Sequence, residues 1–225
     1  MQGLLAALQL GDSRFPSGAF SHSFGLETLI AEGSVRAPDE LAQALDVQLR
    51  ERLARADVPA LLAAHAWAGD LATVCAVDRE LRAVKLTLED RQGSERMGRR
   101  LATEVLRLAP DPALDGFLTA VREGRAPGNH AVALGLAGRA LGLEGRDAAL
   151  VACYTSAAAL VSAAQRLLRL GHGAAQELLL GAWPAMTEAL RIAEGVDWRE
   201  LCPCAPGFDV ASARHERAPS RLFAS

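Results

Sequence analysis

Aromatic and β-branched residues are scarce in this sequence. Aromatic residues make up 4% of the 225 residues, and no stretch of useful length alternates apolar with polar side chains. A β-sheet protein is therefore not expected, because strands favour those residue types and that alternation. Alanine and leucine dominate instead, and 50% of the residues are hydrophobic. The chain can bury a sizeable core, and helices are the elements that would build it.

Lysine is almost absent as well. Lys85 is the only one, and it does not follow a glycine-rich loop, so a P-loop nucleotide site is excluded. The sequence also has no Gly-x-Gly-x-x-Gly after a strand, no His-Glu-x-x-His and no cysteine–histidine framework with zinc spacing. The net charge of −3 comes from interleaved acidic and basic residues, which gives no basic patch for nucleic acid.

The cysteines are few and scattered, at Cys75, Cys153, Cys202 and Cys204, which argues against a disulfide framework. The first residues lack the cationic start and the cleavage site of a signal peptide. We therefore expect a reducing, cytoplasmic location. Residues 148–165 carry no charge and could span a bilayer by length, but they are mostly Ala, Ser and Thr. We interpret them as a buried central helix and expect no membrane contact.

A helical period runs through nearly the whole chain. The clearest example begins at Pro38, after which Leu41, Leu45, Leu49 and Leu53 repeat every four residues. The sequence predicts an all-α fold, a single-domain bundle of roughly eight to ten helices.

One domain is expected to cover residues 1–225, because no linker or repeat divides the chain. Pro184 is expected to kink or split the helix in which it lies. The Pro- and Cys-rich residues 202–207 set off a short tail, at about 205–225, that we expect to become ordered on a partner.

The stretch DSRFPSGAFSHSFGLE, residues 12–27, contains residue types used in nucleophilic catalysis. An enzyme site would use Asp12, Ser13 and His22. Triad members normally come from distant segments, and three on one local loop could hardly line up with an oxyanion hole. A structural turn is the favoured interpretation, and His22 is open to two roles, as a packing residue or as a contact residue.

Several blocks of the sequence resemble, in order, the UreF family of urease accessory proteins. They are LQLGDSRFPSGAFSHSFGLE, RQGSERMGRRL (91–101), PGNHAVALG (127–135), QRLLRLGHGAAQ (165–176) and DVASARHERAPSRLFAS. Together they cover essentially the whole chain. One departure is His172, where the family more often has Gln. An imidazole can become charged, so a contact made by His172 at an interface would depend on pH.

The resemblance implies a helical, dimer-forming protein that is not an enzyme. Such proteins join a second accessory protein, UreD (also called UreH), and a nickel-binding GTPase, UreG, in an assembly that acts on apo-urease. GTP hydrolysis drives nickel insertion into the urease active site. Nickel and GTP would then be handled by the partners, and this chain would bind no cofactor directly.

Three surfaces are expected to bind partners, and each mixes charged or polar groups with apolar anchors. The expected contact residues are Ser13, Phe15, His22 and Glu27 in the first stretch, Arg99 and Arg100 within 91–100, and Arg214, His215, Glu216, Arg221, Leu222 and Phe223 in the tail. Two alternatives stay open: Arg99 and Arg100 as a solvated helix face, and the tail as plain disorder.

A rival function is that of a direct nickel carrier, using Cys202, Cys204, His215 or His22, since thiolates and imidazoles bind Ni²⁺. A single Cys-x-Cys with no third ligand nearby is a weak metal signal, and we predict no metal site.

Overall fold

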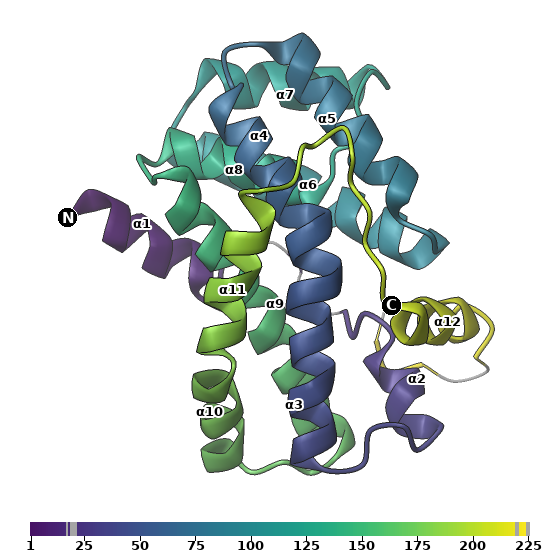
Figure 1. Cartoon of the computed structure of the whole chain (residues 1–225). Coiled ribbons are helices and arrows are strands. Elements are labelled where there is room, and N and C mark those ends of the chain that lie inside the picture. Colours follow the sequence, from purple (N-terminus) through teal and green to yellow (C-terminus); the bar gives the residue numbers. More distant parts are fainter. Residues whose placement is uncertain (17, 19–21, 219–220, 224–225) are drawn as a thin grey trace.

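The computed structural model describes residues 1–16, 18, 22–218 and 221–223, and over these residues it contains helices and no strand. The α-helices are α1 (Gln2–Gly11), α2 (Leu26–Ala31), α3 (Pro38–Val47), α4 (Asp57–Ala66), α5 (Leu71–Val84), α6 (Leu88–Leu108), α7 (Pro112–Arg122), α8 (His130–Ala140), α9 (Gly145–Leu167), α10 (His172–Gly181), α11 (Trp183–Ala193) and α12 (Pro206–His215) (Figure 1). The predicted all-α, single-domain fold is confirmed. The described residues form somewhat more α-helices than the roughly eight to ten that the sequence predicted, and several of them are short.

Helix α9 lies at the centre of the bundle (Figure 1). By length and composition alone it could cross a membrane, but α1, α2, α3, α4, α8, α10 and α11 all pack against it. Its small residues Ala157 and Ala164 are fully buried, which lets the neighbouring helices approach closely. This packing is that of a core helix, as the sequence indicated.

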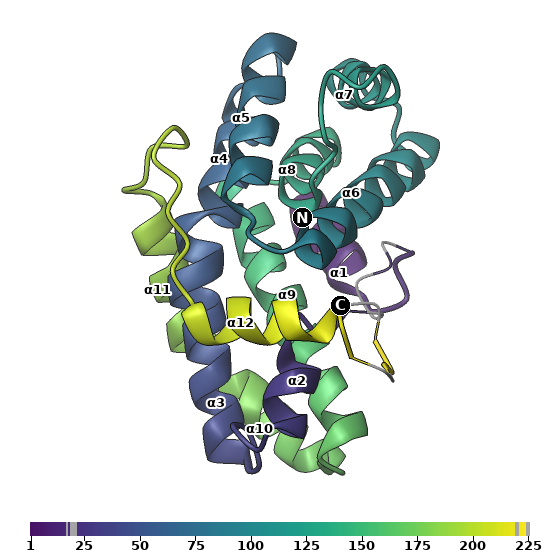
Figure 2. The same ribbon diagram turned by 90° about the vertical axis from the view of Figure 1, so that its right-hand side faces the viewer.

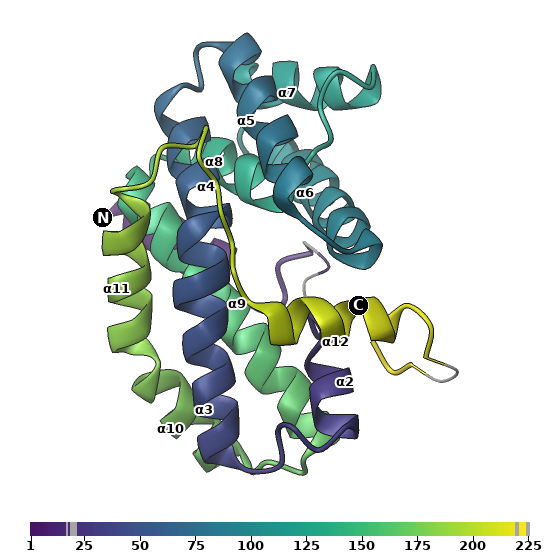
Figure 3. The same cartoon turned by 45° about the vertical axis from the view of Figure 1, so that its right-hand side comes forward.

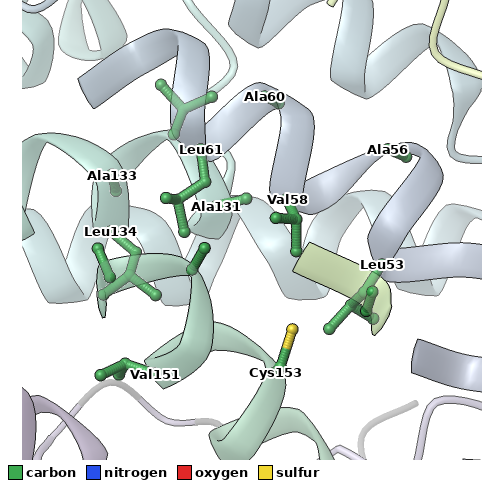
Figure 4. Close-up of a cluster of buried hydrophobic side chains, with 14 of the residues drawn as sticks. Leu53, Ala56, Val58, Ala60, Leu61, Ala131, Ala133, Leu134, Val151 and Cys153 are labelled. Carbon is green, nitrogen blue, oxygen red and sulfur yellow. The ribbon is translucent and has the colours of Figure 1, made fainter. Parts of the chain in front are cut away.

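The core at one end of α9 is formed by four segments (Figure 4). Buried side chains of α4, of α8 and of α9 meet there, together with Leu53 from a short 3₁₀ turn, Leu53–Arg55. Helix α8 lies so close to α4 that Gly135 leaves no space for a side chain beside the Leu61 carbonyl. Small residues on α8 therefore set the spacing of the two helices.

The helical run is interrupted after α3 and again after α10. The chain from Pro38 to Ala66 is not one helix, because a π-helical turn, Gln48–Arg52, and the 3₁₀ turn separate α3 from α4. The split predicted at Pro184 is confirmed: α10 ends at Gly181 and α11 begins at Trp183, with the proline in its first turn.

The described residues of the C-terminal tail pack on their own chain, and further ordering on a partner stays a prediction. Residues 206–215 form α12, which lies across the molecule between α2 and α6 (Figures 2 and 3). Phe208, Ala211 and His215 are buried on its inner side. The described part of the tail is thus held by its own chain, because α12 has an inner face that packs and an ion-pair network that holds its end.

Candidate functional site

The first stretch and the C-terminal tail meet at the N-terminal end of α6. His215 of α12 lies between two carboxylates: its Nδ1 is 2.8 Å from Glu89 Oε2 of α6, and its Nε2 is 3.0 Å from Glu27 Oε2 of α2. His215 is 1% exposed. With a carboxylate at hydrogen-bond distance from each ring nitrogen, His215 links three helices, α2, α6 and α12. We call this group the Glu27–His215–Glu89 cluster.

The same two carboxylates bind the last described residues of the chain. Glu27 accepts hydrogen bonds from the backbone N–H groups of Leu222 (2.9 Å) and Phe223 (3.2 Å). Burial opposes the ionised form of Glu27, but these N–H groups and His215 outweigh it and lower its pKa. Arg221 donates to Glu89 at 2.8 Å. The tail is therefore fastened through its backbone as well as its side chains.

Helix α6 also begins against the tail. Glu216 accepts hydrogen bonds from the backbone N–H groups of Leu88 (2.8 Å) and Glu89 (3.3 Å), which lie in the first turn of α6. A carboxylate there satisfies free N–H groups and interacts favourably with the helix dipole. Thr87, the N-cap of α6, in turn contacts Ser212 of α12 at 3.0 Å. The end of α12 thus caps α6.

The burial of the predicted contact residues divides them into two groups. His22, His215 and Phe223 are buried and serve the fold itself. In this chain alone His215 and Phe223 are covered by their neighbours, and their predicted partner contacts stay a prediction. The exposed members are Ser13, Arg99, Arg100, Arg214, Arg221 and Leu222, while Phe15, Glu27 and Glu216 are partly buried.

His22 packs against α6. A side chain at Gly93 would come within 2.9 Å of His22 Cε1, so the ring occupies the space that a glycine leaves. The ring also stacks on Phe24, with centroids 5.9 Å apart. Burial lowers the pKa of His22 to about 4, with a further contribution from Arg96. Of the two roles left open by the sequence, the structure supports the packing one.

The blocks at 91–101 and 127–135 pack on each other. Gly98 of α6 faces the backbone of Gly128 and Asn129, where a side chain would clash, and Ser94 Oγ accepts a hydrogen bond from His130 N–H at 3.1 Å. The two blocks therefore belong to one contact between α6 and the start of α8.

Asp78 anchors this contact from α5. Its carboxylate accepts hydrogen bonds from the backbone N–H groups of Gly128 (2.6 Å) and Asn129 (2.9 Å) and from Asn129 Nδ2 (2.8 Å). Burial raises the pKa of Asp78 against the effect of these donors. The sequence analysis missed this residue, although its helical spacing from Val74 and Leu81 puts an Asp on the buried face of α5.

The only lysine belongs to a buried network of charges. Lys85 Nζ is 3.0 Å from Asp57 and 3.8 Å from Asp90, and Arg52 lies 3.2 Å from Asp90 and 3.8 Å from Asp209. Burial opposes the charge on Lys85, but the two carboxylates outweigh it and raise its pKa. These residues line a cavity of about 90 Å³. Through Asp209 the network also holds α12.

Asp12, Cys202 and Cys204, which the rival functions would use, make contacts of their own. The Asp12 carboxylate faces Arg14, which is 2.9 Å away. Cys202 and Cys204 are exposed free thiols on an extended segment whose backbone N–H groups bond to Arg55 and Glu51 carbonyls.

Within the described part of the chain, no group of three or more His, Cys, Asp or Glu residues could hold a metal ion. His172 is exposed, with Nδ1 at 3.3 Å from Gln165 Nε2, and its proposed pH-dependent contact stays a prediction.

Comparison with known proteins assigns the blocks to one family. The UreF family model matches residues 35–182. The protein named "Urease accessory protein UreF" of Bacillus sp. (strain TB-90) is 32% identical over the full length of both chains. "Urease accessory protein UreF 1" of Brucella melitensis is 33% identical over 99% of this chain and 93% of its own. The UreF protein of Paenarthrobacter aurescens is 31% identical over 98% of this chain and 97% of its own.

Proposed function

Because the chain belongs to the UreF family of urease accessory proteins, we propose that it serves in the maturation of urease as a non-catalytic scaffold. It joins UreD (UreH) and recruits and regulates the nickel-binding GTPase UreG on apo-urease. The observation that carries this proposal is the match to urease accessory proteins over essentially the whole chain, rather than over one domain.

The arrangement of the ionisable side chains supports a scaffold. His215 and its two carboxylates hold α2, α6 and α12 together, and the charges around Lys85 hold α12 to the core. Groups that could carry proton transfer are thus used for internal contacts. What the chain offers outward is shape, charge and a few apolar side chains, which are the means of recruiting partners.

The tail supplies one partner surface. Leu222 is 74% exposed although its backbone is fixed by Glu27, and Arg221 next to it is held by Glu89. An apolar side chain on a fixed backbone loses little entropy when a partner covers it. Leu222 is therefore the anchor that a partner covers, and the cluster behind it keeps it in place.

A homodimer is part of the proposal. Leu4, Leu5 and Leu8 on α1 are each more than 60% exposed, and α1 extends from the bundle at the edge of Figure 1. Such a leucine face is what a second copy of this chain would cover. We also propose that the protein acts in the cytoplasm, where this assembly would form.

Mixing experiments with purified UreD and UreG test the scaffold. Leu222→Asp should abolish co-elution with them in size-exclusion chromatography, whereas Leu108→Asp, an equally polar change at the far end of α6, should not. Equal co-elution of both variants would remove the tail from the interface. Equilibrium dialysis against Ni²⁺ distinguishes the scaffold from a direct nickel carrier. A carrier requires tight stoichiometric binding that is lost in a Cys202→Ser/Cys204→Ser variant.

A further inference from the structure

The exposed face of α6 is rich in arginine, and the two carboxylates beside it, Glu95 and Glu104, are paired with Arg82 and Arg107. The outward residues at its helical period are Gln92, Arg96, Arg99, Arg100, Thr103 and Arg107. Arg107 pairs with Glu104 at 2.8 Å. For Arg96, Arg99 and Arg100, no carboxylate of the described residues lies within 4.0 Å in any ion pair. We call these three side chains the α6 arginine strip.

Exposed arginines elsewhere usually have an acidic neighbour. Arg191 pairs with Glu188, Arg50 with Asp46, and Arg214 with Glu32, all on the surface. A chain with a net charge of −3 supplies such partners readily. Among the described residues, single exposed arginines without an ion pair occur elsewhere, such as Arg139 and Arg169, but Arg96, Arg99 and Arg100 are three on one helix, and their spacing of three and four residues places them side by side.

The helix that carries the strip is held firmly from behind. Gly93 seats His22, Ser94 binds the start of α8, and Gly98 lies against the backbone of residues 128 and 129. Arg99 is itself close to this contact, since a side chain at Gly128 would meet Arg99 Cγ at 3.2 Å. A fixed helix presents its guanidinium groups in a defined arrangement, which suits bidentate contacts to carboxylates.

We propose that the α6 arginine strip is the docking surface for a carboxylate-rich face of a partner protein in the urease maturation assembly. This inference rests on the proposed function. It adds Arg96 to the expected contacts, makes electrostatic attraction the means of binding and separates this surface from Leu222 on the tail. Charges of this kind mainly raise the rate of association and select the partner.

An acidic protein fits the strip better than a nucleic acid or a membrane does. Three guanidinium groups neutralise about three phosphates, a small number against the six to ten contacts of typical DNA-binding proteins. A local acidic surface at contact distance is attracted by the strip and, within a Debye length of about 8 Å at physiological salt, is affected little by the distant charges.

Charge reversal tests the strip directly. The variant Arg96→Glu/Arg99→Glu/Arg100→Glu is compared with Arg36→Glu/Arg139→Glu/Arg169→Glu, three exposed arginines elsewhere on the molecule. Each triple changes the net charge by −6. Binding of both variants and of the unchanged chain to immobilised UreD–UreG is measured between 50 and 300 mM salt.

We expect the strip variant to bind on the order of tenfold more weakly or worse at 100 mM salt, with a flatter salt dependence. The control triple should stay within about twofold. A variant with Lys at all three strip positions should keep the salt dependence but lose affinity, because Lys lacks the bidentate fork.

Equal affinity and equal salt dependence of the strip variant and the unchanged chain would overturn the inference while leaving the scaffold intact. Strip-dependent binding to a DNA duplex or to phosphatidylserine vesicles, with protein binding unaffected, would overturn it too. If the unchanged chain itself fails to bind UreD–UreG, the proposed function falls, and the inference with it. Thermal melts of all variants should coincide, since the substituted side chains are exposed.

Discussion

Replacing Glu27 with Gln should release the C-terminal tail without unfolding the bundle. The carboxylate of Glu27 accepts from three donors, His215 Nε2 and the backbone N–H groups of Leu222 and Phe223. Glutamine keeps the size and one accepting oxygen but removes the charge, so all three interactions lose their charge assistance.

The expected loss follows from these contacts. Hydrogen bonds to charged groups contribute about 1.5–3 kcal/mol each, and the partial exposure of the tail brings the sum for three weakened bonds to about 2–4 kcal/mol. Every 1.4 kcal/mol is tenfold in an equilibrium constant, so local opening of the tail should rise by roughly 30- to 1000-fold. The surface pair between Glu32 and Arg214 is worth about 0–1 kcal/mol.

Hydrogen exchange at the Leu222 and Phe223 amides measures this opening, because their N–H groups are the ones that Glu27 binds. The control is Glu32→Gln, which removes the same charge from the neighbouring surface pair and should change exchange by less than about fivefold. Exchange in the Glu27→Gln variant within threefold of the unchanged chain would refute the view that Glu27 fastens the tail.

Three further substitutions or conditions test other contacts. Gly98→Ala should lower the free energy of unfolding by about 1–3 kcal/mol in urea denaturation, whereas Gly173→Ala, with open space around it, should not. Lys85→Met should lower the free energy of unfolding by about 3–5 kcal/mol, because the carboxylates of Asp57 and Asp90 lose their cation. A variant as stable as the unchanged chain would show that water solvates these carboxylates instead. His22 and His130 have folded pKa values of about 4 against 6.5 when unfolded, so the unfolded chain binds more protons and stability falls as the pH drops from about 6.5 to 4. At pH 5 each histidine lowers the free energy of unfolding by about 2 kcal/mol. A His130→Gln variant whose stability falls with acid as much as that of the unchanged chain would contradict this.

Features set by neighbouring residues could be predicted from the sequence. The split at Pro184, the start of α3 at Pro38 and the buried character of α9 all follow from proline geometry and from helical period, which act over a few residues. Two of the blocks that carried the family resemblance, 91–101 and 127–135, pack on each other.

Contacts between distant segments could not be predicted in the same way. His215 is 188 residues from Glu27 and 126 from Glu89, and no local pattern shows that α12 returns to them. The tail was therefore expected to need a partner, although its own chain supplies the carboxylates. Asp78 was overlooked for a related reason, because its donors lie about 50 residues further along the chain.

The central claim is that this chain supports nickel insertion into urease as a scaffold and does no bond-making itself. Apo-urease incubated with UreD, UreG, GTP and Ni²⁺ should gain nickel and urease activity when this chain is present and gain neither when it is left out. Equal nickel content per urease active site with and without the chain would contradict the account.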